Sequence, residues 1–219
     1  MSVALITELS FSEALFRVHY TQGFKLTYPI PLPTSVAGMF GAMLGLKRSD
    51  VLKEFSEFLF GAKAKYPARI LAENATFLQY KSKGIERGVA PATILSRPVF
   101  QIAIAGDENK IKKICSKIEN GLVYQPYGGQ NDFFCEDWKI EEIVNVDKSK
   151  EISNYCPEDW VESIAVTSSS DFMILPVKHF LSEKMNFYFI INGKLRLKRE
   201  VPCAVDIALY SLKDFVYQV

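Results

Sequence analysis

The pattern of apolar and polar positions changes its period along the chain, and each change marks an element that we predict. Residues 3–9 and 14–20 are extended runs of strand-forming residues, so we expect β structure at the start of the chain. Over residues 36–44, apolar side chains recur at helical spacing, and either Thr34 or Ser35 is a candidate N-cap for that helix. The chain is thus expected to open with strands that are followed by a helix.

The middle of the chain mixes helical and strand periods. A second helix is predicted over residues 51–59, ending near Gly61, because its apolar residues again form one stripe. The clearest helix runs over residues 107–120, where lysines lie opposite a stripe of isoleucines and Gly121 ends the pattern. Strands are predicted around these helices, at residues 69–80, 99–105 and 138–146.

The last third is β-rich, and a polar stretch with a proline, residues 147–159, is a candidate linker before it. We therefore divide the chain into residues 1–146 and a smaller β-rich part, residues 147–219. Within that part, Asn192-Gly193 separates two strand-like runs, which predicts a hairpin with a type I′ turn. Three basic residues share one face of the second run, and this face meets either a phosphate backbone or water: Lys194, Arg196 and Lys198.

Residues 28–46, YPIPLPTSVAGMFGAMLGL, combine a rigid segment with an unusually bare helix. The prolines at 29, 31 and 33 hold the residues before them in extended conformations. At about 100° per residue, Gly38, Gly41 and Gly45 fall opposite the apolar stripe of the helix. Each glycine weakens the helix by about 1 kcal/mol relative to alanine, so the bare face is expected to have a purpose. Either a phosphodiester backbone or another protein chain approaches it, or the helix packs closely against a sheet of the same fold.

A second unusual segment, KSKGIERGVAPAT at residues 81–93, is polar and long for a loop. The basic residues in and just beyond it outnumber the single acidic residue, Glu86: they are Lys81, Lys83, Arg87 and Arg97. The segment is either a basic finger that projects from a sheet or a solvated loop.

Composition narrows the class of protein. The chain has 219 residues, a formal charge of +1 and 48% hydrophobic residues, as expected of one large folded domain or two small ones. This charge excludes a globally basic nucleic-acid-binding protein and leaves room for a local basic face. The N-terminal residues lack the pattern of a signal peptide or a membrane span, so we expect a cytoplasmic protein without a membrane partner.

The chain offers few residues for catalysis or metal binding. The four cysteines show no C-x-x-C spacing and the two histidines lie apart from them in the sequence, so we expect no metal and no cofactor. The thiols are expected to be reduced and buried. P-loop, Rossmann, zincin, hydrolase-elbow and kinase motifs are absent. Metal-independent RNA cleavage, with His19 or His179 as acid or base, is the enzymatic option that this leaves.

Several segments, in a fixed order, resemble one known family. A strand with ALFR (14–17) is followed by YPIPLPTSVAGMFGAMLG (28–45), LSRPVF (95–100), a helix, and YQPYGGQNDFF (124–134). Together they are similar to the CRISPR-associated Cas-five family, the RAMP-superfamily subunit of type I Cascade complexes. The resemblance covers residues 1–140, and the segment of prolines, hydroxyls and glycines is its most specific part.

The resemblance implies an α+β fold with a ferredoxin-like domain of RRM type. A protruding β-hairpin thumb would be inserted near residues 80–97, and a smaller β-rich C-terminal part would follow. The resemblance also implies a non-catalytic subunit for antiviral defence, which caps one end of the Cascade and holds the 5′ handle of the crRNA. Its protein partners would be the Cas-seven backbone subunit and the Cascade large subunit. The lysine and isoleucine content favours subtype I-A or I-B.

Candidate RNA contacts follow from the matching motifs and from nearby residues. By motif, the handle-facing surface includes Arg17, Thr34, Ser35 and Val36, the thumb carries Lys81, Lys83 and Arg87, and the glycine-rich turn is Gly128, Gly129 and Gln130. To these we add His19, Lys25, Tyr28, Gly38, Gly41 and Arg97.

Subtype I-C members of this family are the exception to the binding role, because they cleave repeat RNA with a tyrosine, a lysine and a histidine. Here no Lys-His pair follows the thumb in the first domain, and the one such pair, Lys178-His179, lies in the tail. We therefore expect no catalytic residues, with a metal-independent endoribonuclease acting on CRISPR repeat RNA as the alternative. A third interpretation, a pure protein-interaction module that docks by its glycine helix, predicts no affinity for RNA.

Overall fold

A five-stranded antiparallel sheet forms the centre of the structure, in the strand order β17-β5-β8-β1-β9. The structure, a computed structural model, describes residues 2–21, 23–82, 84–179 and 182–215. Along the chain, four of these strands alternate with two helices as β1-α1-β5-β8-α3-β9. Their bounds are β1 (Ser2–Phe11), α1 (Pro33–Met43), β5 (Leu59–Ala64), β8 (Val99–Asp107), α3 (Glu108–Glu119), β9 (Cys135–Asn145) and β17 (Tyr210–Ser211).

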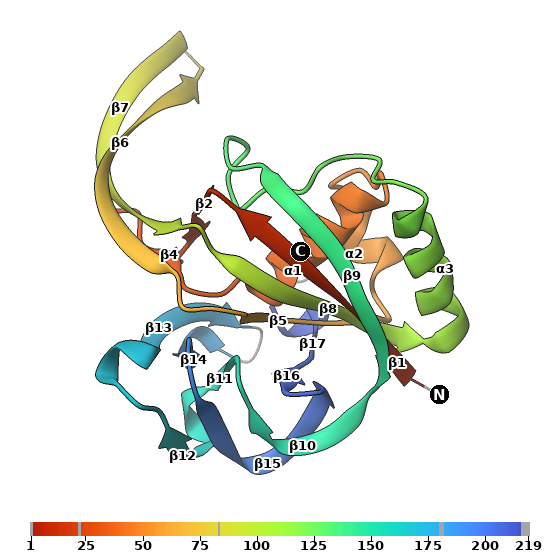
Figure 1. Cartoon of the computed structure of the whole chain (residues 1–219). Coiled ribbons are helices and arrows are strands. Elements are labelled where there is room, and N and C mark those ends of the chain that lie inside the picture. Colours follow the sequence, from red (N-terminus) through yellow and green to blue (C-terminus); the bar gives the residue numbers. More distant parts are fainter. Residues whose placement is uncertain (1, 22, 83, 180–181, 216–219) are drawn as a thin grey trace.

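The central strand β1 is buried on both faces, which explains why its sequence is nearly continuous in apolar residues. Leu5 and Leu9 belong to the main core together with residues of α1 and α3. Ala4 and Ile6 point the other way, into a second cluster with residues of the C-terminal part. Helices α1 and α3 therefore cover one face of the sheet, and the C-terminal strands cover part of the other (Figure 1).

Helix α3 closely matches the helix predicted over residues 107–120. Asp107 is its N-cap, and the Asp107 carboxylate accepts hydrogen bonds from the backbone N–H groups of Asn109 and Lys110. The buried side is the predicted stripe, which consists of Ile111, Ile114, Cys115 and Ile118.

Helix α1 keeps its predicted apolar stripe but begins earlier than the hydroxyl residues indicated. Its first residue is Pro33 and its N-cap is Leu32, with no side-chain cap, so the expectation that Thr34 or Ser35 caps it is wrong. Proline suits the first helical position because the N–H that it lacks would have no intrahelical partner there.

The predicted second helix is wrong beyond its first turn. Helix α2 (Val51–Glu54) has four residues, and the chain then enters β5, which contains Gly61. In β5, Leu59 lies opposite Ala105 of β8 and Phe60 opposite Ile104. Leu59, which continues the helical period, lies in this strand, whereas Phe55 and Phe58 are buried in the turn before it. Tertiary contacts therefore override the local preference.

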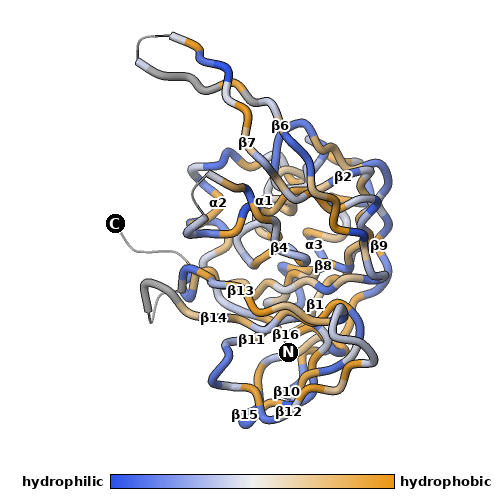
Figure 2. Tube along the Cα trace, turned by 90° about the vertical axis from the view of Figure 1, so that its left-hand side faces the viewer, coloured by the Kyte–Doolittle hydropathy of each residue, from blue (hydrophilic) through white to orange (hydrophobic). Residues whose placement is uncertain are grey.

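A long hairpin projects from the body of the molecule (Figure 1). Its strands, β6 (Arg69–Lys81) and β7 (Gly84–Ser96), have 13 residues each and pair along their whole length. The strand predicted at 69–80 is confirmed, but residues 84–93 form the returning strand rather than a loop, so the insertion starts before residue 80. The base of the hairpin is attached by β2 (Glu13–Ala14), which pairs with the end of β7. Apolar as well as polar residues lie along the projecting part (Figure 2).

Two small sheets make up the β-rich C-terminal part. Strands β10, β15 and β12 form one, with β16 paired to β15, and strands β11, β14 and β13 form the other. The expected linker at 147–159 is wrong, because β10 and β11 occupy most of it. The bounds are β10 (Asp147–Ile152), β11 (Tyr155–Pro157), β12 (Val161–Ala165), β13 (Phe172–His179), β14 (Ser182–Ile190), β15 (Lys194–Ala204) and β16 (Ile207–Ala208).

The expected hairpin at Asn192-Gly193 is also wrong, because β14 and β15 belong to different sheets. Gly193, with a φ of 132°, turns the chain from one sheet to the other. The N–H groups of Ile191 and Asn192 donate to the carbonyl of Asp171 instead of closing a type I′ turn.

The basic row of β15 does alternate with buried leucines, as predicted. Arg196 Nε lies 3.2 Å from the carboxylate of Glu162, and Lys194 Nζ lies 3.8 Å from that of Glu151. Because acidic neighbours accompany these cations, the row favours the interpretation in which it faces water.

In the described ranges, no helix has the length and apolar character that crossing a bilayer requires. The same ranges contain no group of three histidine, cysteine, aspartate or glutamate side chains that could hold a metal ion. All four cysteines are free thiols and buried, as the sequence predicts.

Candidate nucleic-acid interface

A short antiparallel ribbon, β3 (Phe16–Arg17) paired with β4 (Thr27–Tyr28), carries the main candidate site. The loop that joins these strands is held against the base of the β6–β7 hairpin. The N–H of Lys25 donates to the carbonyl of Pro91 (2.9 Å), and the N–H of Thr93 donates to the carbonyl of Lys25 (2.8 Å). Because backbone groups make these contacts, the position of the loop does not depend on the side chains of Arg17 and Lys25.

Two open hollows lie along this loop, and Arg17 lines both. The larger has a volume of about 530 Å³ and lies between the loop and the hairpin base; it is lined by Arg17, Gly23, Phe24, Lys25, Gly88, Val89 and Ala90. The smaller has a volume of about 290 Å³ and is lined by Arg17, Val18, His19, Tyr20 and Thr21. Concave surfaces that combine cations with aromatic rings suit a nucleotide strand, because phosphates and bases then have different partners.

Positive charge converges on these hollows from two distant parts of the chain. Burial lowers the pKa of Lys25, and the nearby Arg17 lowers it further. The pKa of His19 is lowered first by burial, then by Lys178, an exposed residue of β13, and then by Arg17. Besides burial, the charges of Arg17 and Lys178 thus act on these residues, which indicates a positive potential that attracts anions.

Tyr28 is part of the support of the site and not of its surface, which corrects its predicted role as an RNA contact. Its side chain is 1% exposed, and its ring stacks on Phe189 with 5.3 Å between centroids. Its hydroxyl donates to the carbonyl oxygen of Pro176 at 2.7 Å and lies 3.0 Å from Nδ1 of His19. Burial raises the pKa of Tyr28 far above its ordinary range, so the hydroxyl keeps its proton.

The first turn of α1 is less accessible than the sequence predicts. Val36 is fully buried, and the N–H groups of Ser35 and Val36 both donate to the carbonyl of Leu32. Neither the side chain nor the N–H of Val36 is therefore available to RNA, which makes its predicted contact wrong. Thr34 and Ser35 are half-buried, and no residue of α1 lines either hollow.

The three glycines in and just after α1 do not share one environment, so neither of the two interpretations of the bare face holds for all of them. A Cβ on Gly38 would meet nothing within 4 Å. A Cβ on Gly41 would lie 2.9 Å from Cγ2 of Val51 in α2, and one on Gly45 would lie 2.7 Å from Cγ1 of Val123. Gly45, with a φ of 74°, also ends the helix in a left-handed conformation. Gly41 and Gly45 thus serve packing within the fold, whereas Gly38 faces open space.

The glycine-rich turn, residues 128–130, packs against the start of the ribbon. The N–H of Leu15 donates to the carbonyl of Gly128 at 2.8 Å. A Cβ on Gly128 would lie 2.8 Å from that of Ala14, and a Cβ on Gly129, whose φ is 87°, would overlap the carbonyl oxygen of Leu15. Close packing against β2 and β3 therefore explains both glycines without an RNA contact, and Gln130 is exposed beside them.

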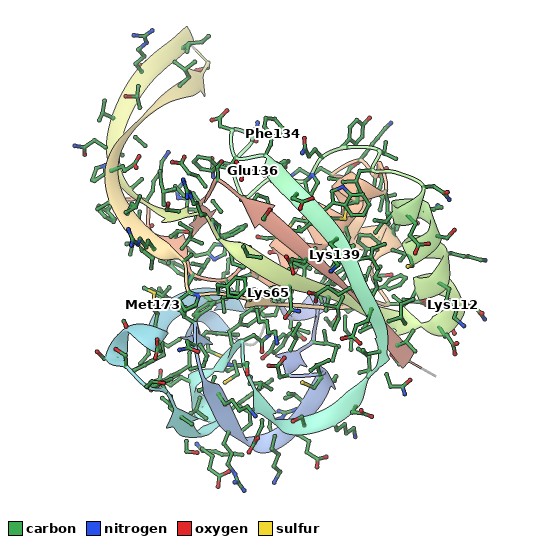
Figure 3. The ribbon with its side chains drawn as sticks, in the orientation of Figure 1. Lys65, Lys112, Phe134, Glu136, Lys139 and Met173 are labelled. Carbon is green, nitrogen blue, oxygen red and sulfur yellow. The ribbon has the colours of Figure 1, made fainter. Side chains whose placement is uncertain are left out.

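The basic residues predicted for the thumb do not line the two hollows. Arg87 is exposed on β7 opposite Leu78, away from the hairpin base. Side chains project from both faces of this outer part of the hairpin (Figure 3). Arg97 is exposed in the turn after β7, with a φ of 49°. Lys83 and the side chain of Lys81 lie outside the described part of the structure.

Sequence reasoning identified Arg17, His19 and Lys25 as residues of this site but missed what surrounds them. The hairpin residues Gly88–Ala90 line the larger hollow, although the sequence places them in a solvated excursion. Lys178 stands out in the sequence only as half of a Lys-His pair in the tail. No spacing rule connects these segments, because the fold brings them together from the hairpin and from the C-terminal part.

Comparisons with known proteins found similarity at the level of the fold. No protein-family model and no curated protein matches the sequence. Among solved structures, a chain of a "CRISPR RNA-guided surveillance complex" is similar, with 17% identity, coverage of 97% of this chain and 95% of that chain, and a TM-score of 0.50. The chain thus shares its fold with that protein over nearly its whole length.

Two other solved structures are more distant. One is described as "Crystal structure of Cas protein", with 13% identity, coverage of 91% and 94% of the two chains, and a TM-score of 0.45. The other is a chain of the type III-B Cmr-beta complex bound to cognate target RNA and AMPPnP, with 14% identity, coverage of 89% and 86%, and a TM-score of 0.44. These structural neighbours are CRISPR proteins or complexes by their descriptions.

Proposed function

We propose that this protein is a non-catalytic subunit of a type I CRISPR Cascade surveillance complex in the cytoplasm. As a member of the Cas-five family, of subtype I-A or I-B, it binds the 5′ handle of the crRNA and caps one end of the assembly. The single observation that carries this proposal is the pair of hollows beside Arg17, at the base of the projecting hairpin.

The topology supports the family assignment. The order β5-β8-β1-β9, with α1 and α3 as crossovers, is that of a ferredoxin-like domain. The β6–β7 hairpin follows the second strand of this domain and precedes the third, which is where the family resemblance expects a thumb. The similarity over nearly the whole chain to a protein of a CRISPR RNA-guided surveillance complex supports a role in such a complex.

The open part of the sheet face is a weaker candidate for RNA, although RRM-type domains use that face. Glu8, which shares the face of Ala4 and Ile6, contacts the ammonium group of Lys65. Glu141 also contacts Lys65, at 3.0 Å, and these bonds hold the pKa of Lys65 above its ordinary value (Figure 3). Carboxylates already engage this lysine, and they repel phosphates.

The outer hairpin suits the protein partners, the Cas-seven backbone subunit and the large subunit. Three large apolar side chains along the hairpin are more than half exposed: Leu78 at 53%, Ile85 at 61% and Val89 at 69%, of which Val89 also lines the larger hollow. Residues that pair across an antiparallel ladder share one face, and so do alternate pairs along it. Leu78, Ile85 and Val89 belong to alternate pairs, so they lie on one face of the hairpin. Exposed apolar side chains gathered on one face mark a surface that another protein covers.

A salt titration of RNA binding tests the proposal. We expect a single-stranded RNA with the repeat-derived 5′ handle to bind, with an affinity that falls linearly on logarithmic axes as salt rises. The Arg17→Ala variant should weaken binding and reduce the salt slope by roughly 0.7, the value for one phosphate contact on a single strand. The matched control is Arg196→Ala, which removes an exposed arginine paired with Glu162 and should leave the slope unchanged.

Two results would count against this account in different ways. Wild-type protein without salt-dependent affinity for the RNA would contradict RNA binding and favour a pure protein-interaction module. Equal effects of the two arginine variants would contradict the location of the site and leave RNA binding in place.

One observation favours a second candidate, the metal-independent endoribonuclease. The lowered pKa of His19 keeps its imidazole neutral near pH 7, as a general base requires, and Lys178 and Arg17 lie close enough to influence it. The other histidine, His179, has a side chain outside the described part of the structure. We expect purified protein to leave labelled repeat RNA intact in EDTA. Site-specific cleavage that His19→Ala or His179→Ala abolishes would reverse the assignment.

A further inference from the structure

The hydrogen bonds around Tyr28 fix which nitrogen of His19 carries the proton. The hydroxyl oxygen of Tyr28 lies 2.7 Å from the carbonyl oxygen of Pro176, and a carbonyl cannot donate, so the Tyr28 proton lies between the two oxygens. The Tyr28 oxygen must then act as an acceptor toward His19. It accepts the backbone N–H of His19 at 3.2 Å and, at 3.0 Å, the proton on Nδ1 of the ring.

This network assigns the Nδ1–H tautomer to neutral His19, an assignment that comes from the bonded partners. In that tautomer Nε2 has no proton and is an acceptor. Nδ1 points to the buried Tyr28 and His19 lines the smaller hollow, so Nε2 is the ring nitrogen left for that hollow. Neutral imidazole is favoured here because burial, Lys178 and Arg17 lower the pKa of His19.

A fixed acceptor is an unexpected feature beside Arg17, which supplies the positive charge among the residues that line this hollow. Phosphate oxygens accept hydrogen bonds and do not donate them, so Arg17 suits phosphates whereas Nε2 of neutral His19 does not. Along an RNA strand, each phosphate has a ribose 2′-hydroxyl near it, and that group is a donor. The two kinds of group in this hollow thus match the two kinds of group that alternate along an RNA backbone.

We propose that Nε2 of His19 accepts a hydrogen bond from a ribose 2′-hydroxyl, and that this bond lets the site distinguish RNA from DNA. Arg17 contributes affinity through phosphates, which DNA shares, whereas His19 contributes the preference for ribose. Tyr28 is a positioning residue, because it acts through the tautomer of His19. The inference rests on the proposed function, since it requires a single RNA strand in the smaller hollow.

Single 2′-deoxy substitutions along the handle RNA test this inference with unmodified protein. We expect one position at which the loss of the 2′-hydroxyl weakens binding by about 3- to 10-fold, the range for a neutral hydrogen bond. In the His19→Ala variant the same substitution should change the affinity by less than about 2-fold, because the acceptor is already absent. His19→Gln keeps a side-chain carbonyl near the place of Nε2 and should restore part of the difference.

The outcomes separate this inference from the proposed function. A position that is equally sensitive in wild type and His19→Ala, or the absence of any sensitive position, overturns the role of His19 while salt-dependent RNA binding stands. Failure of the wild-type protein to bind RNA overturns both. If the bound RNA is cut beside the sensitive position, His19 is a general base and the binding role is replaced by the endoribonuclease.

The tautomer itself can be measured in the wild-type protein. The chain has two histidines, so ¹⁵N NMR of the imidazole nitrogens gives two sets of signals, and one His19→Ala spectrum assigns them. We expect the His19 signals of a neutral Nδ1–H ring at pH 7.5, and a change toward mixed tautomers in Tyr28→Phe. A neutral Nε2–H ring in the wild-type protein would overturn the inference, because Nε2 would then be a donor.

Discussion

The glycines in and just after α1 provide a sharp test of the structure, because each has a different environment. Gly38 faces open space, so Gly38→Ala adds a methyl group without a clash. Gly45 has a φ of 74°, and a methyl group there would lie 2.7 Å from Val123. The same chemical change is therefore expected to stabilise the protein at one position and destabilise it at the other.

The magnitudes follow from the conformations. Glycine within a helix is less favourable than alanine by about 1 kcal/mol, so Gly38→Ala should raise the free energy of unfolding by about that amount. For a chain of 219 residues this corresponds to an increase in Tm of about 2–4 °C. Alanine at Gly45 must adopt a left-handed conformation, which costs about 1–2 kcal/mol before the contact with Val123 is counted. Its Tm should fall by at least about 2 °C.

Differential scanning calorimetry of the wild type and both variants checks the signs. A lower Tm for Gly38→Ala, or a higher one for Gly45→Ala, would refute the environments described for these glycines. The Gly38→Ala protein also tests the predicted RNA contact of that residue. A weaker affinity for handle RNA in this more stable protein would support the contact, and an unchanged affinity would confine binding to the hollows beside Arg17.

Three further predictions concern helix capping, pH and the thiols. Asp107→Ala removes the acceptor of two N–H groups at the start of α3 and should cost about 1 kcal/mol, measured by urea denaturation. His19 has a pKa below 6.5 in the folded state, so the unfolded chain binds its proton more readily. The contribution of His19 to stability should be fully present above pH 6.5 and should fall as pH drops from 6.5 toward the folded-state pKa. Denaturation at pH 7.5 and 5.5 measures it, and His19→Ala should remove this part of the pH dependence. Native protein should resist alkylation by iodoacetamide at pH 8 and take up four adducts when denatured, because its thiols are buried and burial raises the pKa of Cys135 to about 11 and of Cys203 to about 12.

Elements with strong local signals could be predicted from the sequence, and elements that depend on partners in space could not. Helix α3 has a cap, a clear stripe and a terminal glycine, and each of these signals acts within a few residues. The segment after α2 has an equally regular apolar period, yet it forms a turn and then β5, because β8 pairs with residues 59–64 and the core buries Phe55 and Phe58 without a helix. Asn192-Gly193 failed for a similar reason, since the strands on either side pair with other strands.

In the candidate site, too, features with local signals could be predicted and features that depend on distant segments could not. Arg17 is identifiable by motif and Lys25 by residue type, because the ribbon and the loop that carry them are local in sequence. The sequence left the role of the glycines open, because a bare helix face looks the same in sequence whether RNA or Val51 and Val123 lie against it. Lys178 had no signal that linked it to Arg17, since only the packing of the C-terminal part brings the two together.

That packing also explains why the site includes the C-terminal part, although most of its cations precede residue 30. The β3–β4 ribbon has few hydrogen bonds of its own, since each strand has two residues, and it is positioned from three sides. Lys25 pairs with the hairpin base, Gly128 holds Leu15, and Tyr28 stacks on Phe189 while its hydroxyl reaches Pro176. The same hydroxyl fixes the ring of His19. The contact that attaches the ribbon to the C-terminal part is therefore also the contact that decides which hydrogen bonds the site can make to a nucleotide strand.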